Sequence, residues 1–557
     1  MPKLHPLVER ILKERAIENV DEFLNPSYAD RPNPFLIADM DVAVSRIGEA
    51  LEKKEKIAAW TDYDCDGIPA GALLSHFFRS IAHPVRSYIP ERSEGYGLNR
   101  AGILKLKEEG ITLIITADVG ITDIEEAAFA KEHGIDIIIS DHHLPGDVLP
   151  EAVAVLNPHR ADCPYPEKDL CGTGVAFKLV EALIRKNSDL RNHYFSWNEG
   201  QEKWLLDLVA LATVADMVPL LGENRTLVRY GLVVLSKGRH AGLRALMETM
   251  RIPLSAVTED DIAFSIAPKI NAASRMKSPH LALELLTTED DERARTLARE
   301  LVKLNDARKL EGARVAKEVK RRLEGAPLDE VIVLGNPSWN PALLGIAATN
   351  VVETYRRPVC LWGKDGELIK GSCRSDGSVN IVSLMSASRE LFDDYGGHER
   401  SGGFSLKSAS VHALPDALRK AYETLASEQQ TIVPDEKPEA DGALALSEAT
   451  EAAYRALRTL APFGVGNPKP VFAVPGTRVE RVLRFGKHGE HVRLALSDDN
   501  GTVRDAVGFF TSRNLWHAEA ELVSAGDAVV LNASLEQSFF AGRKELRLRL
   551  EHLSFSE

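Results

Sequence analysis

The apolar positions between residues 56 and about 160 fall into short continuous runs. KIAAW (56–60), ITLIIT (111–116) and IDIIIS (135–140) are almost wholly apolar. Strands of this kind are buried on both faces, which is typical of a parallel sheet covered by helices. The segments between them, such as PAGALLSHFFRSIA (69–82), have the spacing of helices. The pattern therefore predicts an α/β unit with a parallel sheet.

Beyond this unit the hydrophobic pattern changes three times. Residues 225–325 have helical periodicity and few turn signals, and 292–325 predict a long solvated helix that links domains. A second α/β pattern starts at VIVLGN (331–336). After the polar, Pro-containing stretch 427–442, short alternating strands predict an all-β module, a small barrel.

Length and composition are those of a globular protein. A chain of 557 residues suggests three or four domains at roughly 150 residues each, and 44% hydrophobic residues can fill several cores. No apolar stretch of about 20 residues occurs, so we expect no membrane-spanning helix. The first fifteen residues, MPKLHPLVERILKER, lack the apolar core of a signal peptide.

The cysteines favour a cytoplasmic location. They are five, an odd number, scattered and without a CxxC pair. We therefore expect a reducing compartment, no disulfide scaffold and no thiolate zinc site. The five positions are Cys65, Cys163, Cys171, Cys360 and Cys373.

The net charge of −14 is an argument against a nucleic-acid partner, because phosphate contacts need Lys and Arg. The argument is limited, since binding depends on the local field and not on the charge of the whole surface. Acidic side chains that hold metal ions would also lose their effect on that field.

Acidic and imidazole side chains follow three predicted strands at the point where each strand ends. In a parallel sheet these ends share one edge, where ligands bind. So much negative charge in one crevice needs cations to balance it. The residues are Asp62, Asp64 and Asp66 after the first strand, Asp118 after the second and Asp141, His142 and His143 after the third; Asp216 ends a predicted helix at 204–216.

Each of these residues also has an ordinary structural interpretation. A lone Asp after a strand, such as Asp118, is more often a helix N-cap or a turn former, and Asp216 could cap a turn. Their coincidence at the ends of three strands favours a metal site. Because carboxylates dominate and thiolates are absent, we expect Mn²⁺ or Mg²⁺, and two ions would suit phosphoester hydrolysis.

Four motifs resemble those of the DHH phosphoesterase superfamily: DYDCDG (62–67), TADVGI (116–121), SDHHLP (140–145) and ATVADMVPL (212–220). Further segments, among them IPERSEGYGL, GSCRS, GGHERSGGF and APFGVGNPKPVF, are similar to those of its bacterial 5′→3′ exonucleases specific for single-stranded DNA. They occur in the same order over nearly the whole chain.

The resemblance implies five segments and an activity. We expect a metal-dependent 5′→3′ exonuclease that hydrolyses single-stranded DNA to 5′-mononucleotides in DNA repair and recombination. The segments would be an N-terminal helical segment (1–45), a DHH catalytic domain with a parallel sheet (46–225), a helical connector (226–325), a DHH-associated substrate-binding α/β domain (326–430) and an OB-like nucleic-acid-binding barrel (440–557).

The resemblance also assigns roles in the catalytic domain. Metal ligands would be Asp64 and Asp66 with Asp62 beside them, completed by Asp118, His142 and Asp216, and Asp118 would bridge the two ions. His143 would lie near the scissile phosphate as a cation or proton donor. Asp141 would orient a ligand.

Substrate contacts are implied at three places. Arg92 matches the position that holds a 5′-terminal phosphate, and Asn271 and Arg275 match backbone contacts. For each of these arginines a solvated surface role is the alternative, and for the motif residues of the second α/β domain it is a structural turn. Those motif residues are Ser372, Arg374 and Ser375 in GSCRS and Gly397, His398, Gly402 and Gly403 in GGHERSGGF.

The chain departs from the family pattern at several positions. Trp60-Thr61 stand where His-Gly is usual, Asn340 stands for His, and Ser274 stands for Gly. These changes leave metal affinity, recognition of the 5′ end and processivity open.

Two other functions remain possible on the sequence. One is a phosphodiesterase for short oligonucleotides or cyclic dinucleotides, and the other is a non-catalytic scaffold that binds single strands. By analogy we expect a monomer that acts on single-stranded DNA with single-strand-binding protein and a RecQ-type helicase, without a membrane.

Overall fold

The computed structural model describes residues 4–189, 197–325, 327–428, 439–487, 489–511, 514, 516–540 and 543–556. The chain divides into two compact units. Unit 1 comprises Met1–Glu18, Ala307–Thr459 and Lys469–Glu557, and unit 2 comprises Asn19–Asp306 and Leu460–Pro468. The five segment boundaries expected from the sequence remain predictions.

Unit 2 contains the predicted parallel sheet, with the strand order β2-β1-β3-β4-β5. All neighbouring strands are parallel, and the sheet is almost entirely buried, which confirms the prediction made from the continuous apolar runs. The strands are β1 (Lys56–Thr61), β2 (Arg86–Tyr88), β3 (Ile111–Ala117), β4 (Asp136–Ser140) and β5 (Ala154–Leu156).

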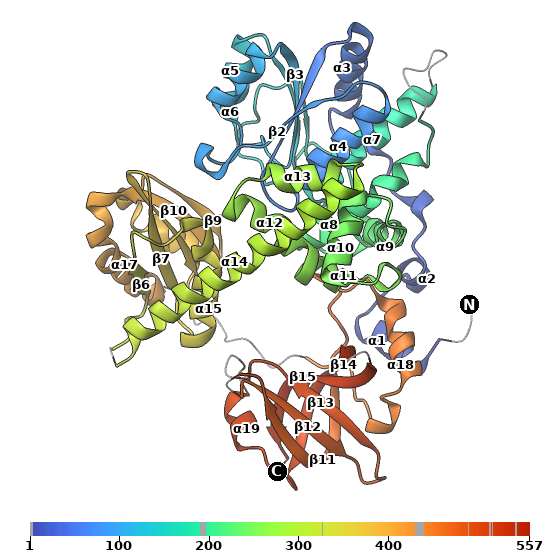
Figure 1. Cartoon of the computed structure of the whole chain (residues 1–557), viewed down its shortest axis with the longest axis vertical. Coiled ribbons are helices and arrows are strands. Elements are labelled where there is room, and N and C mark those ends of the chain that lie inside the picture. Colours follow the sequence, from blue (N-terminus) through green and yellow to red (C-terminus); the bar gives the residue numbers. More distant parts are fainter. Residues whose placement is uncertain are drawn as a thin grey trace. The chain divides into compact units, whose positions relative to one another are not determined.

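Helices cover both faces of this sheet (Figure 1). On one face α3 (Met40–Lys53), α4 (Gly67–Ser80) and α7 (Gly172–Asp189) pack on one set of alternate strand residues, which includes Ala59 and Ile115. On the other face α5 (Arg100–Glu108) and α6 (Ile124–Glu132) pack on the other set.

A helical region extends the core of unit 2 beyond the sheet. The region ends in α14 (Asp291–Leu323), which has 33 residues, begins in unit 2 and continues into unit 1 after Asp306; it corresponds to the long helix predicted at 292–325. The other elements are α8 (Leu206–Ala215), α9 (Gly222–Ser236), α10 (Ala241–Met250), α11 (Glu259–Asp261), the π-helical turn η6 (Ile262–Ile266), α12 (Ala267–Met276) and α13 (His280–Thr287).

Unit 1 contains a second sheet with the order β6-β7-β8-β10-β9. Only β6 and β7 are parallel, and the other pairs are antiparallel. The elements are β6 (Ile332–Gly335), α15 (Pro341–Tyr355), β7 (Val359–Asp365), β8 (Leu368–Arg374), α16 (Ile381–Ser386), β9 (Asp394–His398), β10 (Ser401–Lys407) and α17 (Leu414–Glu428).

The C-terminal strands form a closed barrel, β11-β12-β13-β15-β14, as predicted. The N-terminal helix α1 (Pro6–Glu14) contacts α18 (Glu451–Leu457), and Arg15 Nε lies 2.6 Å from Asp441 Oδ1. The strands are β11 (Phe472–Phe485), β12 (His491–Ser497), β13 (Val503–Gly508), β14 (Ala528–Phe540) and β15 (Arg543–Phe555).

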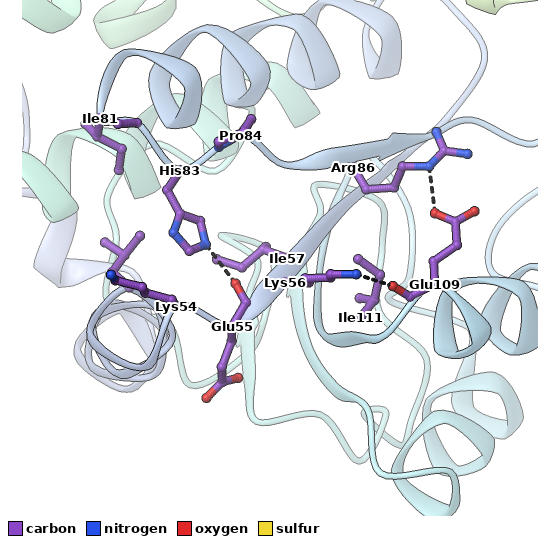
Figure 2. Close-up of a pocket in the computed structure, with 12 residues that line it drawn as sticks. Lys54, Glu55, Lys56, Ile57, Ile81, His83, Pro84, Arg86, Glu109 and Ile111 are labelled. Carbon is purple, nitrogen blue, oxygen red and sulfur yellow. Dashed lines mark hydrogen bonds and ion pairs between the residues drawn. The ribbon is translucent and has the colours of Figure 1, made fainter.

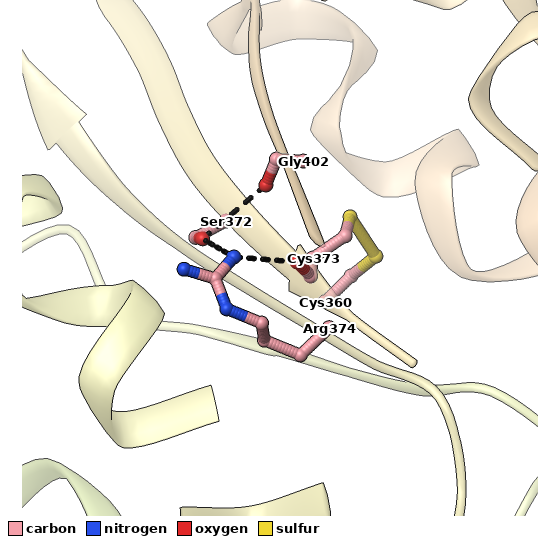
Figure 3. Close-up of a disulfide and its surroundings, with 5 residues drawn as sticks. All are labelled: Cys360, Ser372, Cys373, Arg374 and Gly402. Carbon is pink, nitrogen blue, oxygen red and sulfur yellow. Dashed lines mark hydrogen bonds between the residues drawn. A yellow bond between two sulfur atoms is a disulfide. The ribbon is translucent and has the colours of Figure 1, made fainter. Parts of the chain in front are cut away.

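The sequence argued against a disulfide scaffold, and the structure has one disulfide. Cys360 and Cys373 are directly opposite each other on β7 and β8 and form a disulfide (Figure 3). The two cysteines are 13 residues apart, and only the pairing register of the hairpin brings their side chains together. Cys65, Cys163 and Cys171 are buried and free. The cysteine pattern therefore no longer supports the inference of a reducing compartment.

Within the described ranges, no helix combines the length and apolar character needed to cross a membrane.

Candidate active site

The predicted acidic residues meet at the carboxyl edge of the parallel sheet. Backbone hydrogen bonds continue past the ends of the strands, from Asp118 N–H to Ser140 O (3.0 Å) and from Asp141 N–H to Leu156 O (3.0 Å). These bonds hold the residues after β3 and β4 in register. Asp118 has φ +67°, a left-handed conformation that Asp adopts more readily than most residues.

Among the described residues, three groups of side chains offer ligand atoms within 4.8 Å of one another. Asp118 and His142 each belong to two groups, so the groups form one continuous cluster. His142 Nε2 lies 3.2 Å from Asp118 Oδ1, 3.7 Å from Asp66 Oδ2 and 3.8 Å from Asp216 Oδ2. The groups are Asp62, Asp64 and Asp118; Asp66, His142 and Asp216; and Asp118, His142 and His143.

Asp66 is oriented by the N-terminus of α7. Its two carboxylate oxygens accept hydrogen bonds from the backbone N–H groups of Gly172 (2.6 Å) and Thr173 (2.7 Å), and the Thr173 hydroxyl donates to Asp66 O (2.7 Å). A Cβ on Gly172 would lie 2.5 Å from Asp118 Cβ, so only glycine lets α7 approach this closely. Gly172 and Thr173 belong to the segment LCGTGVAF, but the sequence alone does not reveal that they bind and orient Asp66.

Burial and mutual repulsion raise the pKa values of the clustered carboxyl groups. Burial first, then neighbouring carboxylates, raises the pKa of Asp62, Asp64 and Asp118. The same causes raise the pKa of Asp216 to about 8. Asp62 Oδ1 is buried and accepts no hydrogen bond within the described part of the chain. The cluster therefore carries negative charge that the surrounding protein does not balance.

Asp141 holds the two histidines in place. Its Oδ1 accepts a hydrogen bond from the backbone N–H of His142 (2.7 Å) and lies 2.8 Å from His143 Nδ1, while Oδ2 accepts from Ile121 N–H (2.9 Å). Although burial opposes it, the contact with Asp141 raises the pKa of His143 to about 9. Burial instead lowers the pKa of His142, which favours the neutral imidazole that binds metals.

Metal ions with a preference for oxygen fit this set of donors. Carboxylates dominate, one or two imidazoles are added, and the groups contain no thiolate, a combination that suits Mn²⁺ or Mg²⁺ better than Zn²⁺. The repelling carboxylates and the unpartnered oxygen of Asp62 are what a site for divalent cations requires.

Arg92, Asn271 and Arg275 also belong to unit 2. Arg92, in the short helix η3 (Arg92–Glu94), lies with its Cζ 4.2 Å from the centre of the Tyr63 ring and donates to Ser274 Oγ at 3.3 Å. It therefore connects the Asp62–Asp66 loop to helix α12, which carries Asn271 and Arg275. Asn271 Oδ1 is buried without a hydrogen-bond partner among the described residues.

The sequence did not single out Tyr96. Its hydroxyl lies 3.3 Å from Asp118 O and 3.4 Å from the nearest nitrogen of His143. Burial, then the charge of Asp118, raises the pKa of Tyr96, so the phenol stays protonated. The available signal in the sequence was that Tyr96 belongs to IPERSEGYGL, one of the segments that resemble the family.

Two residues that depart from the family pattern, Trp60 and Asn340, have structural roles in this chain. Trp60 is buried, donates from Nε1 to Gly97 O (3.2 Å) and stacks on Tyr88 with ring centres 4.2 Å apart. Asn340 caps α15 by accepting a hydrogen bond from Ala342 N–H (3.0 Å). Trp60 thus belongs to the core of the sheet and offers no metal ligand.

The predicted contacts of the second α/β domain lie on three neighbouring strands of unit 1. On β10, Gly403 is opposite Ser372 of β8 and Gly402 is opposite Gly397 of β9. Arg374 donates to Ser372 Oγ at 2.8 Å (Figure 3). His398 is opposite Ser401, which is also opposite Arg374.

Ser375 differs from these residues because its hydroxyl is used in a turn. It donates to Val379 O (2.6 Å) and accepts from Gly377 N–H (3.0 Å). For Ser375 the alternative of a structural turn therefore has direct support.

A hollow of about 910 Å³ lies at the opposite edge of the parallel sheet (Figure 2). Its polar groups are bonded to one another: Lys56 donates to Glu109 O (2.8 Å), Arg86 to the Glu109 carboxylate (2.9 Å), and His83 Nε2 lies 2.8 Å from Glu55 O. These contacts join the ends of neighbouring helices and strands to one another. The hollow is therefore separate from the acidic cluster.

Comparison with known families gives three matches. Residues 56–213 match the DHH family, N-terminal domain; residues 328–427 match the DHHA1 domain; and residues 440–552 match the RecJ OB domain.

Two relatives are similar over nearly the whole chain. A protein of Bacillus subtilis (strain 168) named single-stranded-DNA-specific exonuclease RecJ is 33% identical over 559 residues, which cover 99% of this chain and 68% of the relative. The protein of the same name from Haemophilus influenzae is 30% identical over 568 residues, covering 99% and 96%.

A solved structure is also similar. The crystal structure of RecJ in complex with Mn²⁺ from Thermus thermophilus superposes with a TM-score of 0.81 at 27% identity, covering 100% of this chain and 76% of the other. A second structure from the same organism, with Mg²⁺, gives a TM-score of 0.76 at 25% identity.

Proposed function

Since the chain belongs to the RecJ family of single-stranded-DNA-specific exonucleases, we propose that its acidic cluster hydrolyses single-stranded DNA from the 5′ end and releases 5′-mononucleotides. The cofactor is Mn²⁺ or Mg²⁺. The observation that carries this function is the continuous cluster of carboxylates and imidazoles at one edge of the sheet.

The proposed metal ligands are Asp64, Asp66, Asp118, His142 and Asp216, with Asp62 beside them. When bound, two divalent cations would lower the pKa of a water molecule and neutralise charge on the phosphate. Asp118 and His142 are shared between the ligand groups, so they are suited to couple the two positions. The N-terminus of α7 holds the Asp66 carboxylate in one orientation through two backbone N–H hydrogen bonds.

His143 supplies a positive charge at the edge of the cluster; it belongs to the group with Asp118 and His142 but is not among the proposed metal ligands. Its side chain is about two-fifths exposed, and the contact with Asp141 keeps it protonated at neutral pH. An imidazolium in this position can donate a hydrogen bond to a phosphate oxygen or a proton to the leaving 3′ oxygen. Asp141 positions this group and does not itself reach the substrate.

Arg92 gives the proposed reaction its direction. A guanidinium that holds a terminal phosphate fixes the 5′ end, so the phosphodiester bond presented to the cluster is always the first from that end. Asn271 and Arg275 on α12 would hold the backbone that follows. In unit 1, Ser372, Arg374, Gly397, His398, Gly402 and Gly403 would bind further phosphates through hydroxyl, guanidinium and backbone N–H groups.

Digestion of end-labelled single strands tests the proposal. With Mn²⁺ present we expect a 5′ label to be released at once as a mononucleotide and a 3′ label to stay on strands that shorten gradually. A 5′-hydroxyl strand should be a poorer substrate than a 5′-phosphorylated one. Digestion in EDTA, or immediate release of a 3′ label, would contradict the proposal.

The two alternative functions have less support. A phosphodiesterase for dinucleotides would have no use for the closed C-terminal barrel, and a non-catalytic scaffold would have no reason to keep donors at every predicted ligand position. Comparing hydrolysis of a dinucleotide with that of a long single strand separates the first alternative, and calorimetry with Mn²⁺ separates the second.

The cellular setting is part of the proposal. We infer a cytoplasmic monomer that acts on single-stranded DNA together with single-strand-binding protein and a RecQ-type helicase. The location is supported by relatives named for their action on single-stranded DNA and not by the cysteines. Chromatography with light scattering, with and without these proteins, tests this composition.

A further inference from the structure

Phe264 is the most exposed large apolar side chain among the described residues. Its exposed fraction is 76%, whereas Ile262 and Ile266 on either side of it are fully buried. The two isoleucines anchor the turn η6 in the core of unit 2, so the position of Phe264 follows from a well-packed backbone. A single exposed apolar residue is ordinary on a protein surface, so what sets Phe264 apart is the fixed turn that holds it and the side chains beside it.

The sequence explains why the turn has π-helical geometry. Pro268 follows Phe264 by four residues, and in an ordinary α-helix its ring would clash with the carbonyl of Phe264 and leave that carbonyl without a donor. The helix widens instead, and Ala267 N–H donates to Ile262 O, five residues earlier. Such single π turns are frequent at functional sites.

Phe264 continues a stripe of accessible side chains on α12. Pro268, Asn271 and Arg275 follow Phe264 by four, seven and eleven residues, spacings that return to about the same side of a helix. All three are partly exposed, whereas the residues between them, such as Ile270 and Ala273, are buried. From Phe264 to Arg275 the stripe presents an aromatic ring, an amide and a guanidinium, and the carboxylates of α11 precede it.

The same helix is joined to the metal cluster. Ser274 accepts a hydrogen bond from Arg92, and Arg92 lies over Tyr63, the residue between Asp62 and Asp64. Along the helix Phe264 is seven residues from Asn271, about 10 Å at 1.5 Å per residue. A strand that leaves the cluster along Arg275 and Asn271 would therefore reach the ring of Phe264.

We propose that Phe264 stacks on a nucleobase of the bound single strand, beyond the backbone contacts of Asn271 and Arg275. This inference rests on the proposed function and adds a specific contact to it. Stacking on an aromatic ring accepts every base, because each has an aromatic face, and so it suits an enzyme that degrades strands of any sequence. A duplex, whose bases are already stacked, could not use this contact.

Equilibrium binding without hydrolysis tests the contact. The full-length protein is kept in EDTA, and its affinity for a 5′-phosphorylated thymidine oligonucleotide is measured by fluorescence anisotropy. Phe264→Ala should weaken binding about tenfold, and Phe264→Trp should bind like the wild type. Val233→Ala is the matched control, since Val233 is an exposed apolar residue on α9, and its affinity should be unchanged.

A scan with single abasic sites locates the base. One abasic position should weaken binding to the wild type by about the same factor as Phe264→Ala, and the variant should be insensitive to that position. An unchanged affinity of Phe264→Ala overturns the inference, and so does an equal loss in Phe264→Trp. If the wild type neither binds the strand in EDTA nor degrades it with Mn²⁺, the proposed function fails and the inference fails with it. If it degrades the strand with Mn²⁺ without binding it in EDTA, KM is measured in place of the affinity, and Phe264→Ala should raise KM about tenfold while Phe264→Trp leaves it unchanged.

Discussion

Asp118 combines three features that tie its backbone and side chain to one function. It has positive φ, its carboxylate belongs to two ligand groups, and Gly172 packs against its Cβ. A non-glycine residue in the left-handed region strains the backbone, and such strain is found mainly where the side chain has a function. The crowding of Asp62, Asp64 and Asp66 around it is the second cost, visible as a raised pKa of Asp118.

Asp118→Asn keeps the size of the side chain and removes its charge. We expect the rate of single-strand hydrolysis to fall by more than about a hundredfold, because the residue would serve both metal positions. Calorimetry should show loss of at least one Mn²⁺. Asp147→Asn, which changes an exposed carboxylate in the loop after His143, should keep full activity. Equal activity of the two variants would refute the role of Asp118.

At the scale of elements, the N-terminus of α7 positions the site. Its first backbone N–H groups bind Asp66, and its first residue must be glycine to approach Asp118. The helix thereby joins the ends of β1 and β3, two strands that are far apart in the sequence.

Gly172→Ala tests this close approach. The added Cβ would lie 2.7 Å from Asp118 Cα, so backbone and not a flexible side chain must move. We expect a loss of roughly 1–3 kcal/mol in the free energy of unfolding in urea, with weaker Mn²⁺ binding. Gly146→Ala is the control, because nothing lies within 4 Å of its added Cβ. A Gly172→Ala variant as stable as the control would contradict the packing argument.

A pair of histidines between two helices predicts a pH effect. His76 on α4 and His240 before α10 have ring centres 4.6 Å apart, and burial, then the charge of His240, lowers the pKa of His76 to about 4. The unfolded chain therefore binds the proton first, near pH 6.5. The stability contributed by neutral His76 is complete above that pH and is lost as the pH falls toward 4.

His76→Gln removes this titration and leaves an amide that can donate to Leu286 O, which now lies 2.8 Å from His76 Nε2. We expect the unfolding free energy of the variant to fall less steeply than that of the wild type between pH 6.5 and 4. Urea titrations across this range measure it. If the unfolding free energies of the variant and the wild type changed in parallel with pH, folding would not lower the pKa of His76.

For the whole molecule, a net charge of −14 has to be reconciled with a DNA substrate. Part of the charge lies in the ligand cluster, where bound cations would balance it. The barrel offers basic and aromatic groups instead: Arg547 and Arg549 each lie with Cζ 5.3 Å from the centre of the Phe509 ring. Arg547 is ion-paired with Glu536 at 3.0 Å, whereas the side chain of Arg549 is about half exposed. Arg549 and the Phe509 ring are therefore the groups suited to a phosphate and a base of a single strand.

Replacing Arg549 by Ser should weaken binding of long single strands and reduce its salt dependence by about one released counterion. Hydrolysis of a strand of a few nucleotides should be unchanged, since the metal cluster is intact. Anisotropy at several salt concentrations measures the slope. A variant with wild-type affinity for long strands would exclude this surface of the barrel.

Much of the architecture followed from local patterns. Continuous apolar runs predicted a parallel sheet, and a parallel sheet brings the ends of β1, β3 and β4 to one edge, so the sequence alone was enough to expect the clustering of Asp62, Asp118 and His142. Alternating strands predicted the barrel for the same reason, because periodicity reports which faces of an element are buried.

Other features depended on tertiary packing. The cap of α7 on Asp66, the disulfide between Cys360 and Cys373, the contact of α1 with α18 and the exposure of Phe264 all join or orient residues by how elements pack. Periodicity is a local property and carries no information on register or on contacts between distant segments. The sequence by itself therefore determined which elements form and where the chemistry gathers, and the tertiary structure decided which neighbours hold each side chain.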